Sequence, residues 1–311
     1  MSPWPVANTA ALSLSRLARD FPVLAESLRG AERAAATDAP VLILGEPGTG
    51  RSTLARAFHQ ASPRAAGPLL EVDVGAIPGT LFESELFGYR AGAFTGAERA
   101  SEGRVGRAEG GTLVLDHVEE LPLITQPKLL RLIAERRYAP LGEAERGADV
   151  RFVAIGSEDL PVRVERQSFR PDLFYRLEVL AFLLPPLRER RRDLPAILDH
   201  LLADLGFRFG RPDPQLAPAA RAWMLEHSWP GNLRQLRNVL ERGMILSGTG
   251  PIDPPPPDGS AESRPRPLLE MEVDAIRKAL AYTRGHQGRA ADLLGISRKA
   301  LWEKRKRYGI P

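Results

Sequence analysis

The chain has 311 residues, 43% of them hydrophobic and 26% charged, which is enough for two or three domains with a sizeable core. It contains no cysteine, which excludes disulfides and thiolate metal sites, and no apolar run approaches membrane-spanning length. Its first residues, Met1-Ser2-Pro3-Trp4-Pro5, lack a basic stretch followed by an apolar core. We therefore expect no signal peptide, no membrane partner and a cytoplasmic location.

The formal net charge of +4 is unevenly distributed along the chain. Residues 262–311 hold 12 Lys and Arg against 6 Asp and Glu, whereas the rest of the chain is slightly acidic. A small basic module on a near-neutral body favours a nucleic-acid partner over a merely solvated basic helix.

The first 186 residues predict an α/β domain. Residues 1–20 read as a short irregular extension with a weak helical stretch over 12–17, and an Ala/Glu/Arg-rich helix is expected over Phe21–Ala36. Compact apolar runs predict buried strands at Val41–Leu44, Leu69–Val74, Thr112–Leu115, Val150–Ile155 and Val179–Leu184. Helical segments lie between them, at Thr53–Gln60, Gln126–Arg136 and Asp172–Leu177. This alternation predicts a mostly parallel sheet covered on both faces.

After Pro185-Pro186 the pattern becomes wholly helical, with predicted helices at Asp193–Leu205, Pro218–His227 and Leu233–Leu246. Asn232 is expected to cap the third of these helices together with Gln235, and Trp229 is expected to be a core or hinge residue. Residues 248–267 contain seven prolines and predict an extended, unpacked linker. Three further helices are predicted at Leu268–Tyr282, Gly288–Leu294 and Ser297–Tyr308.

A glycine-rich turn joins the first strand to the next helix and reads Gly45-Glu46-Pro47-Gly48-Thr49-Gly50-Arg51-Ser52. Glycines let backbone N–H groups face a phosphate, and the helix N-terminus adds a favourable dipole. Such a turn can also be purely structural. If it binds nucleotide, the Ser52 hydroxyl and Asp116, at the end of a later strand, are the expected Mg²⁺ ligands.

The sequence of the basic tail predicts a helix-turn-helix. Ala290, Leu293 and Leu294 form an apolar face, Gly295 ends that helix and Ser297 caps the next. Candidate DNA contacts follow on the second helix: Ser297, Arg298, Lys299, Trp302, Lys304, Arg305 and Lys306. A small helical protein-binding domain is the alternative.

Residues 92–97 read Gly92-Ala93-Phe94-Thr95-Gly96-Ala97 and follow Glu85-Leu86-Phe87-Gly88-Tyr89. Small residues around one aromatic and one hydroxyl side chain predict a sharp loop with Phe94 and Thr95 at its tip. Together with its surroundings, this run resembles the sigma-54-contacting loop of bacterial enhancer-binding proteins. The resemblance covers about residues 20–250 and 268–311.

The resemblance implies an AAA+ P-loop NTPase core with a parallel sheet, an α-helical lid and a C-terminal Fis-type helix-turn-helix. The expected divisions are a short N-terminal extension (1–20), an α/β nucleotide-binding subdomain carrying the sigma-54 loop (21–186), a lid (187–247), a linker (248–267) and a DNA-binding domain (268–311). The implied cofactors are ATP and Mg²⁺. The implied partners are upstream enhancer-like DNA, sigma-54 RNA polymerase and further subunits, from a dimer to a hexamer or a mixed ring with a paralogue.

Further residue roles follow from the resemblance. Arg170 and Arg176 match the arginines that act on the nucleotide of a neighbouring subunit, and Arg234 matches the second sensor. His117 stands where the family has the glutamate that orients the attacking water. Gly156 and Ser157 stand where it has Thr-Asn at the γ-phosphate sensor.

Several positions depart from the family. Arg51 replaces the phosphate-binding lysine, and a planar guanidinium differs from a compact ammonium. Ser52 stands where glutamate is common, and Arg305 occupies an inner position that usually holds leucine. Glu119 and Glu120 follow His117, but strand-end geometry does not obviously aim them at the same point. The changes at Arg51, His117 and Ser157 suggest that hydrolysis has been relaxed or lost.

Three functions remain open. The first is a sigma-54-dependent regulator that binds upstream DNA and uses an ATP-linked ring to remodel the polymerase. The second is a hydrolysis-deficient, nucleotide-gated or passive DNA-binding regulator. The third, weaker, is another AAA+ remodeller of DNA or protein. The sequence shows no receiver or ligand-sensing domain before the core, so control is expected from a partner, from expression level or from the nucleotide.

Overall fold

The computed structural model of the chain describes residues 13–248, 250–257, 272, 273, 275, 276, 279, 280, 283 and 286–308. Contacts divide it into two compact units, Met1–Pro254 and Pro255–Pro311. Most of the helix predicted over Leu268–Tyr282 lies outside the described residues.

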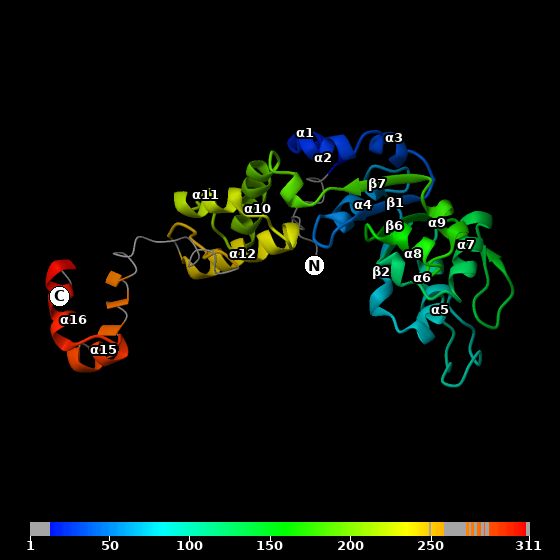
Figure 1. Cartoon of the computed structure of the whole chain (residues 1–311). Helices are drawn as coiled ribbons and strands as arrows, with labels where there is room; N and C mark the ends of the chain where they lie inside the picture. Colours follow the sequence, from blue (N-terminus) through cyan, green and yellow to red (C-terminus); the bar gives the residue numbers. More distant parts are fainter. Residues whose placement is uncertain are drawn as a thin grey trace. The chain divides into compact units, whose positions relative to one another are not determined.

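A five-stranded parallel sheet forms the centre of the larger unit (Figure 1), as the sequence predicted. Its strands, in spatial order, are β2 (Leu69–Asp73), β3 (Thr112–Asp116), β6 (Arg151–Gly156), β1 (Val41–Gly45) and β7 (Leu180–Leu184). Because all of them run in one direction, Gly45, Asp73, Asp116 and Gly156 meet at one edge of the sheet. Ligands of open parallel sheets bind at this carboxyl edge.

Helices cover both faces of the sheet, and alternate residues of one strand enter different cores. Val41 and Ile43 belong to one buried cluster and Leu42 to the other. The helices of this subdomain are α4 (Arg51–Gln60), α5 (Gly79–Phe87), α6 (Gly103–Arg107), α7 (Gln126–Glu135), α8 (Leu160–Glu165) and α9 (Pro171–Leu177). Short elements complete it: η2 (Val74–Ala76), η3 (Val118–Glu120), β4 (Arg137–Tyr138) and β5 (Arg146–Gly147). The next element, η4 (Leu187–Glu189), lies at the start of the lid.

The N-terminal segment is more ordered than predicted. The helical stretch expected over 12–17 is a helix over residues 14–20, α1 (Leu14–Asp20), and its Leu14 and Leu17 are buried in the main core, so the expectation of an irregular extension was wrong for these residues. The expected helix over 21–36 is divided into α2 (Pro22–Ser27) and α3 (Ala31–Ala35). Gly30 adopts φ +80° between them, a conformation that glycine reaches without steric cost and that breaks the helix.

The helical lid consists of α10 (Leu194–Arg208), α11 (Pro218–Glu226) and α12 (Asn232–Leu246). Trp229 is fully buried, as expected for a core residue, and its indole N–H donates to the Met224 carbonyl over 2.9 Å. The expectation that residues 248–267 are unpacked was wrong for the first part. Ile252 is fully buried and exchanges backbone hydrogen bonds with Gln215 and Ala217, because Gly243 leaves room for it against α12.

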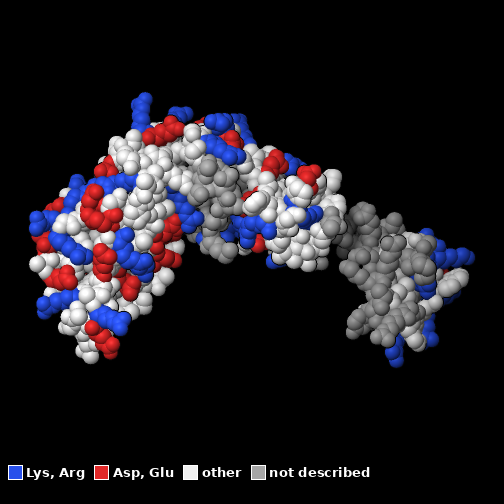
Figure 2. Space-filling model, turned by 180° about the vertical axis from the view of Figure 1, so that it is seen from behind, with Lys and Arg blue, Asp and Glu red and all other residues white. Residues whose placement is uncertain are grey.

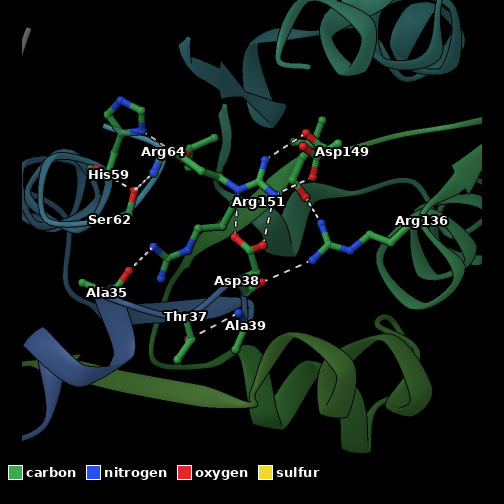
Figure 3. Close-up of polar contacts among 12 residues, drawn as sticks. Ala35, Thr37, Asp38, Ala39, His59, Ser62, Arg64, Arg136, Asp149 and Arg151 are labelled. Atoms are coloured by element: carbon green, nitrogen blue, oxygen red, sulfur yellow. Dashed lines mark hydrogen bonds and ion pairs between the residues drawn. The ribbon is translucent and has the colours of Figure 1, made fainter. Parts of the chain in front are cut away.

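Arginine side chains bond neighbouring segments at the edge of the sheet where the strands begin (Figure 3). Arg64 forms ion pairs with Asp38 and Asp149, and these contacts raise the pKa of Arg64 and lower that of Asp38. Arg151 is fully buried at the start of β6 and donates to the carbonyls of Ala34 and Ala35. These carbonyls lie at the C-terminal end of α3, where backbone acceptors lack partners within the helix.

The smaller unit contains α15 (Gln287–Leu293) and α16 (Arg298–Tyr308). Gly295 adopts φ +66° after the first helix, and the Ser297 hydroxyl accepts a hydrogen bond of 3.1 Å from the Ala300 N–H. Both findings confirm the predicted turn chemistry. Leu301 is buried with Ile276, Ala279, Ala290 and Ala291. No helix in the described parts of the chain is long and apolar enough to cross a membrane.

Candidate nucleotide site and associated surfaces

The glycine-rich loop lies between the end of β1 and the start of α4. Gly45, Gly48 and Gly50 have φ values of +152°, +84° and +106°, which side-chain-bearing residues rarely adopt. A Cβ on Gly48 would also lie 2.6 Å from the Gly231 carbonyl oxygen. The Thr49 hydroxyl closes the turn by donating to the Glu46 carbonyl over 2.8 Å. The loop therefore has the backbone geometry of a phosphate-binding loop.

Ser52 and Asp116 come together as the sequence predicted. The Ser52 hydroxyl donates to Asp116 Oδ2 over 3.4 Å, which joins the first turn of α4 to the end of β3. A hydroxyl and a carboxylate side by side are hard oxygen donors of the kind that Mg²⁺ prefers. The residues present thus fit a Mg²⁺ ion beside a bound triphosphate.

Arg51 is buried and turned toward the protein backbone. Its Nη1 donates to the carbonyls of Gly45, over 2.8 Å, and Gly156, over 2.6 Å. Burial lowers the pKa of Arg51, and the nearby charges of Asp116 and Glu119 oppose that shift. In this structure the guanidinium therefore joins the ends of β1 and β6.

The His117 side chain contacts the end of β2. His117 adopts φ +56°, and its Nδ1 lies 2.9 Å from Asp73 Oδ1 at the end of β2. Its backbone N–H donates to Asp116 Oδ1 over 2.9 Å. The imidazole is 40% exposed and is held by Asp73.

Glu119 and Glu120 lie in different surroundings. Glu119 is close to Gly156, whose carbonyl accepts a hydrogen bond from Arg51. Its side chain is 8% exposed, and its Oε2 has no hydrogen-bond partner within the described parts of the chain. Glu120 instead pairs with Arg163 at the surface. Sequence spacing did not reveal this difference, because a 3₁₀ turn over 118–120 sets the two directions.

The predicted sensors lie beside the loop. The Ser157 hydroxyl donates to the Asp159 carboxylate and, with Arg163, lowers the pKa of Asp159. Arg234 is exposed on α12 and lies against the loop, since a Cβ on Gly48 would be 3.2 Å from Arg234 Cβ.

A polar cluster joins the loop to the lid and was missed by sequence reasoning. Glu46 forms a bidentate ion pair with Arg188 at 2.9 and 2.7 Å, and Asn232 Nδ2 donates to the same carboxylate over 3.0 Å. Arg188 and then Asn232 hold the pKa of Glu46 below its usual value. Asn232 Nδ2 also approaches the Pro47 carbonyl, and the Leu233 N–H donates to the Gly48 carbonyl over 2.9 Å.

Asn232 is therefore not the predicted N-cap. Gly231 occupies the cap position, and its N–H donates to the Gln235 side chain over 2.9 Å. The Asn232 Oδ1 accepts from the Leu187 N–H over 2.7 Å while its Nδ2 donates to Glu46, so the side chain bonds the start of the lid and the glycine-rich loop and does not cap its own helix. A φ of +51° accompanies this orientation, and asparagine tolerates that conformation better than most residues.

Arg170 and Arg176 are both exposed. Arg170 forms an ion pair of 2.7 Å with Asp172, while its backbone N–H donates to the buried Gln126 side chain. Arg176 donates to the Ala134 carbonyl over 3.3 Å. These side chains bond to residues of α7 and α9, and within the described parts of the chain they form no bond to its glycine-rich loop.

The segment containing Gly92–Ala97 forms a narrow projecting loop. Tyr89 and Ser101 exchange backbone hydrogen bonds of 2.8 Å at its base, and the Gly92 N–H donates to the Ala97 carbonyl closer to the tip. Gly92 and Gly96 have positive φ, and Phe94 is 42% exposed against the edge of the Tyr89 ring. The loop therefore presents Phe94 and Thr95 to solvent, as expected.

The basic residues of α16 are mostly exposed (Figure 2). Arg298 and Lys299 lie at its N-terminal end, and the Lys306 ammonium is 5.4 Å from the centroid of the Trp302 ring. Lys304 differs because it is paired with Glu272, which lowers the pKa of Glu272 and raises that of Lys304. Arg305 is half-buried, and its Nε lacks a hydrogen-bond partner within the described residues.

The fold and these sites define a P-loop ATPase core with a helical lid and a separate helix-turn-helix unit. Family models match the sigma-54 interaction domain over residues 17–182, the AAA+ ATPase lid domain over 188–255 and the Fis family of bacterial regulatory proteins over 268–308. The chain belongs to the family of sigma-54-dependent enhancer-binding regulators.

Similar proteins include the C4-dicarboxylate transport regulatory protein DctD of Rhizobium meliloti, 40% identical over 93% of this chain and 63% of DctD. The regulatory protein AtoC of Escherichia coli is 40% identical over 93% of this chain and 67% of AtoC. The crystal structure of NtrX from Brucella abortus in complex with ATP is 32% identical, with a TM-score of 0.67 over 92% of this chain and 68% of NtrX. The chain thus spans about two thirds of the length of these relatives.

Proposed function

We propose that this chain contains the ATP-binding motor and the DNA-binding unit of a cytoplasmic sigma-54-dependent transcriptional regulator. It binds upstream DNA as a dimer, assembles into a ring of subunits and uses ATP to drive Phe94 and Thr95 against sigma-54 RNA polymerase. The proposed divisions are those expected from the sequence, with an α/β subdomain over 21–186, a lid over 187–247 and a DNA-binding domain over 268–311.

The observation that carries this proposal is the projecting loop. Its base is closed by the Tyr89–Ser101 pair, and Leu141, between β4 and β5, is hydrogen-bonded to both Gly88 and Arg90. The loop is thereby connected at its base to a second segment of the α/β subdomain, while Phe94 and Thr95 stay exposed. A movement of the α/β subdomain can be passed to the tip of such a loop, because its base is bonded to that subdomain and its tip is exposed to a partner.

The proposed nucleotide site uses the carboxyl edge of the sheet. Backbone N–H groups from Gly48 to Arg51 would cradle the phosphates, and Ser52 and Asp116 would hold Mg²⁺. Mg²⁺ would neutralise phosphate charge there. Arg170 and Arg176 would reach the nucleotide of a neighbouring subunit. This fits their own contacts, which are with Asp172 and Ala134 and not with the glycine-rich loop.

The test is sigma-54-dependent transcription with Thr95→Ala compared with the natural chain. We expect loss of activation with ATP binding and DNA binding retained. Thr37→Ala is a matched control, since Thr37 lies in the connection before β1 and its hydroxyl donates only to the Ala34 carbonyl nearby. Activation that persists in the Thr95 variant rules out the loop mechanism.

A passive regulator is the second candidate, and two contacts favour it. Arg51 is bonded to backbone carbonyls, and His117 is bonded to Asp73. ATP binding and steady-state hydrolysis of the purified protein, with and without its DNA, separate the candidates when compared with an Arg51→Lys, His117→Glu variant. Turnover in the natural protein supports the motor; binding without turnover, with turnover restored in the variant, supports the passive regulator.

A further inference from the structure

The side chains that follow Asp116 differ in what they contact. His117 Nδ1 lies 2.9 Å from Asp73 Oδ1. Glu120 is 52% exposed and forms an ion pair with Arg163 at 3.2 Å. Glu119 alone of these three turns inward, and its buried Oε2 accepts no hydrogen bond from the described parts of the chain. An unpaired buried carboxylate oxygen is costly, so this arrangement needs a donor that the polypeptide does not supply.

The space that Glu119 occupies exists because residue 156 is glycine. A Cβ at Gly156 would lie 3.3 Å from Glu119 Oε2 and 3.2 Å from Val118 Cγ1. Both contacts are tighter than normal packing, so a larger side chain at position 156 would displace the carboxylate. The family's usual threonine would therefore conflict with this placement of Glu119.

Glu119 lies at the edge of the sheet that carries the glycine-rich loop. Its Oε2 is close to the backbone of Gly156, whose carbonyl accepts a hydrogen bond from Arg51, and its charge opposes the lowering of the Arg51 pKa. Arg51 Nη1 donates to the carbonyls of Gly45 and Gly156, and Glu119 Oε2 has no hydrogen-bond partner within the described residues. A water molecule held beside a terminal phosphate is a donor of suitable chemistry.

We propose that Glu119, and not His117, is the carboxylate that orients and deprotonates the water that attacks the γ-phosphate of ATP. The inference rests on the proposed function, since it requires that ATP binds at this loop. The water oxygen forms a bond to the γ-phosphorus while one of its protons moves to the Glu119 carboxylate. The bond from that phosphorus to the β,γ-bridging oxygen breaks, and its electron pair leaves with ADP. The proton then passes to the released phosphate, and the carboxylate is restored.

The experiment measures two properties of the full chain: steady-state ATP hydrolysis and the binding of a fluorescent ATP analogue. We expect Glu119→Gln to lower kcat by about 10²-fold or more, the scale of general base catalysis, with the dissociation constant changed by less than about threefold. Glu120→Gln is the matched control, because it removes the neighbouring, surface-paired carboxylate, and its kcat should remain within about threefold of the natural value.

Two further variants test the packing argument. Glu119→Asp keeps a carboxylate on a shorter side chain, so it should retain more turnover than Glu119→Gln. Gly156→Thr should displace the carboxylate and lower kcat with nucleotide binding retained. A cooperative thermal unfolding transition of Glu119→Gln without nucleotide, close to that of the natural protein, shows that the variant folds.

The outcomes distinguish a failure of the Glu119 proposal from a failure of the proposed nucleotide function. Unchanged turnover in Glu119→Gln, or equal losses in Glu119→Gln and Glu120→Gln, overturns the role of Glu119. ATP binding with no turnover in the natural protein also overturns it and favours the passive regulator. Failure of the natural protein to bind the analogue instead overturns the proposed nucleotide function itself.

Discussion

Arg51 Nη1 donates to the Gly156 carbonyl over 2.6 Å, so the first residue of α4 is fastened to the last residue of β6. The second acceptor of the same nitrogen is the Gly45 carbonyl at the end of β1. The residue in the position of a phosphate-binding lysine thus bonds two strand ends, and nucleotide must compete with these bonds for the guanidinium.

Replacing Arg51 with lysine tests this competition. A flexible ammonium is more weakly tied to the two carbonyls and is freer to reach a phosphate. We expect Arg51→Lys to bind ATP several-fold more tightly while its free energy of unfolding without nucleotide falls by about 1–3 kcal/mol, the usual loss for charge-assisted hydrogen bonds. Titration with a fluorescent analogue and urea unfolding check the two effects. Weaker ATP binding would contradict this account.

The His117–Asp73 contact predicts how a glutamate at position 117 will behave. His117→Glu alone places a second carboxylate against Asp73, and like charges at this distance repel each other. We expect His117→Glu to melt at a lower temperature than His117→Glu, Asp73→Asn, in which an amide replaces one charge. Thermal unfolding at low salt should show the difference most clearly, and its persistence in 1 M salt would argue against an electrostatic cause.

The Arg188–Glu46 pair predicts a pH-dependent attachment of the loop to the lid. Arg188 lowers the pKa of Glu46 in the folded protein, so the pair stabilises the fold above the ordinary glutamate pKa. That stabilisation is lost as the pH falls through the lower, folded-state pKa. We expect Arg188→Gln to melt below the natural protein at pH 7, with the difference shrinking as the pH falls below the ordinary glutamate pKa and through the lower, folded-state pKa of Glu46. If the difference in melting temperature stays constant from pH 7 to pH 3, Arg188 contributes through packing and not through its ion pair with Glu46.

The helix-turn-helix unit allows two lysines to be distinguished. Lys299 is exposed at the start of α16, whereas Lys304 is paired with Glu272. If Lys299 contacts a phosphate, Lys299→Ala should reduce the slope of log K against log salt by about 0.9. Lys304→Ala should leave that slope almost unchanged and lower the melting temperature of the unit. Fluorescence anisotropy with labelled operator DNA at several salt concentrations measures both slopes, and equal slope changes would show that Lys304 also faces DNA.

Local residue patterns were sufficient for much of the fold. The apolar runs predicted the five parallel strands to within about one residue at most ends, because buried strands between glycine-rich turns have a strong local signature. The turn at Gly295 and the cap at Ser297 were predicted for the same reason. Local patterns failed where a distant partner decided the outcome: Asn232 looked like a helix cap, but Glu46 and the Leu187 N–H use its side chain.

The sequence by itself determined the alternation of strands and helices, the phosphate-loop glycines, the Ser52 and Asp116 positions and the exposed loop with Phe94 and Thr95. These features depend on the order and type of neighbouring residues. Only the tertiary structure decided that Arg51 bonds the ends of β1 and β6, that His117 turns to Asp73, and that Glu119 enters the space left by Gly156. The Arg51–Gly156 and His117–Asp73 contacts join residues 105 and 44 positions apart, and the direction of Glu119 depends on a single 3₁₀ turn. These relationships exist only once the carboxyl ends of the parallel strands meet at one edge.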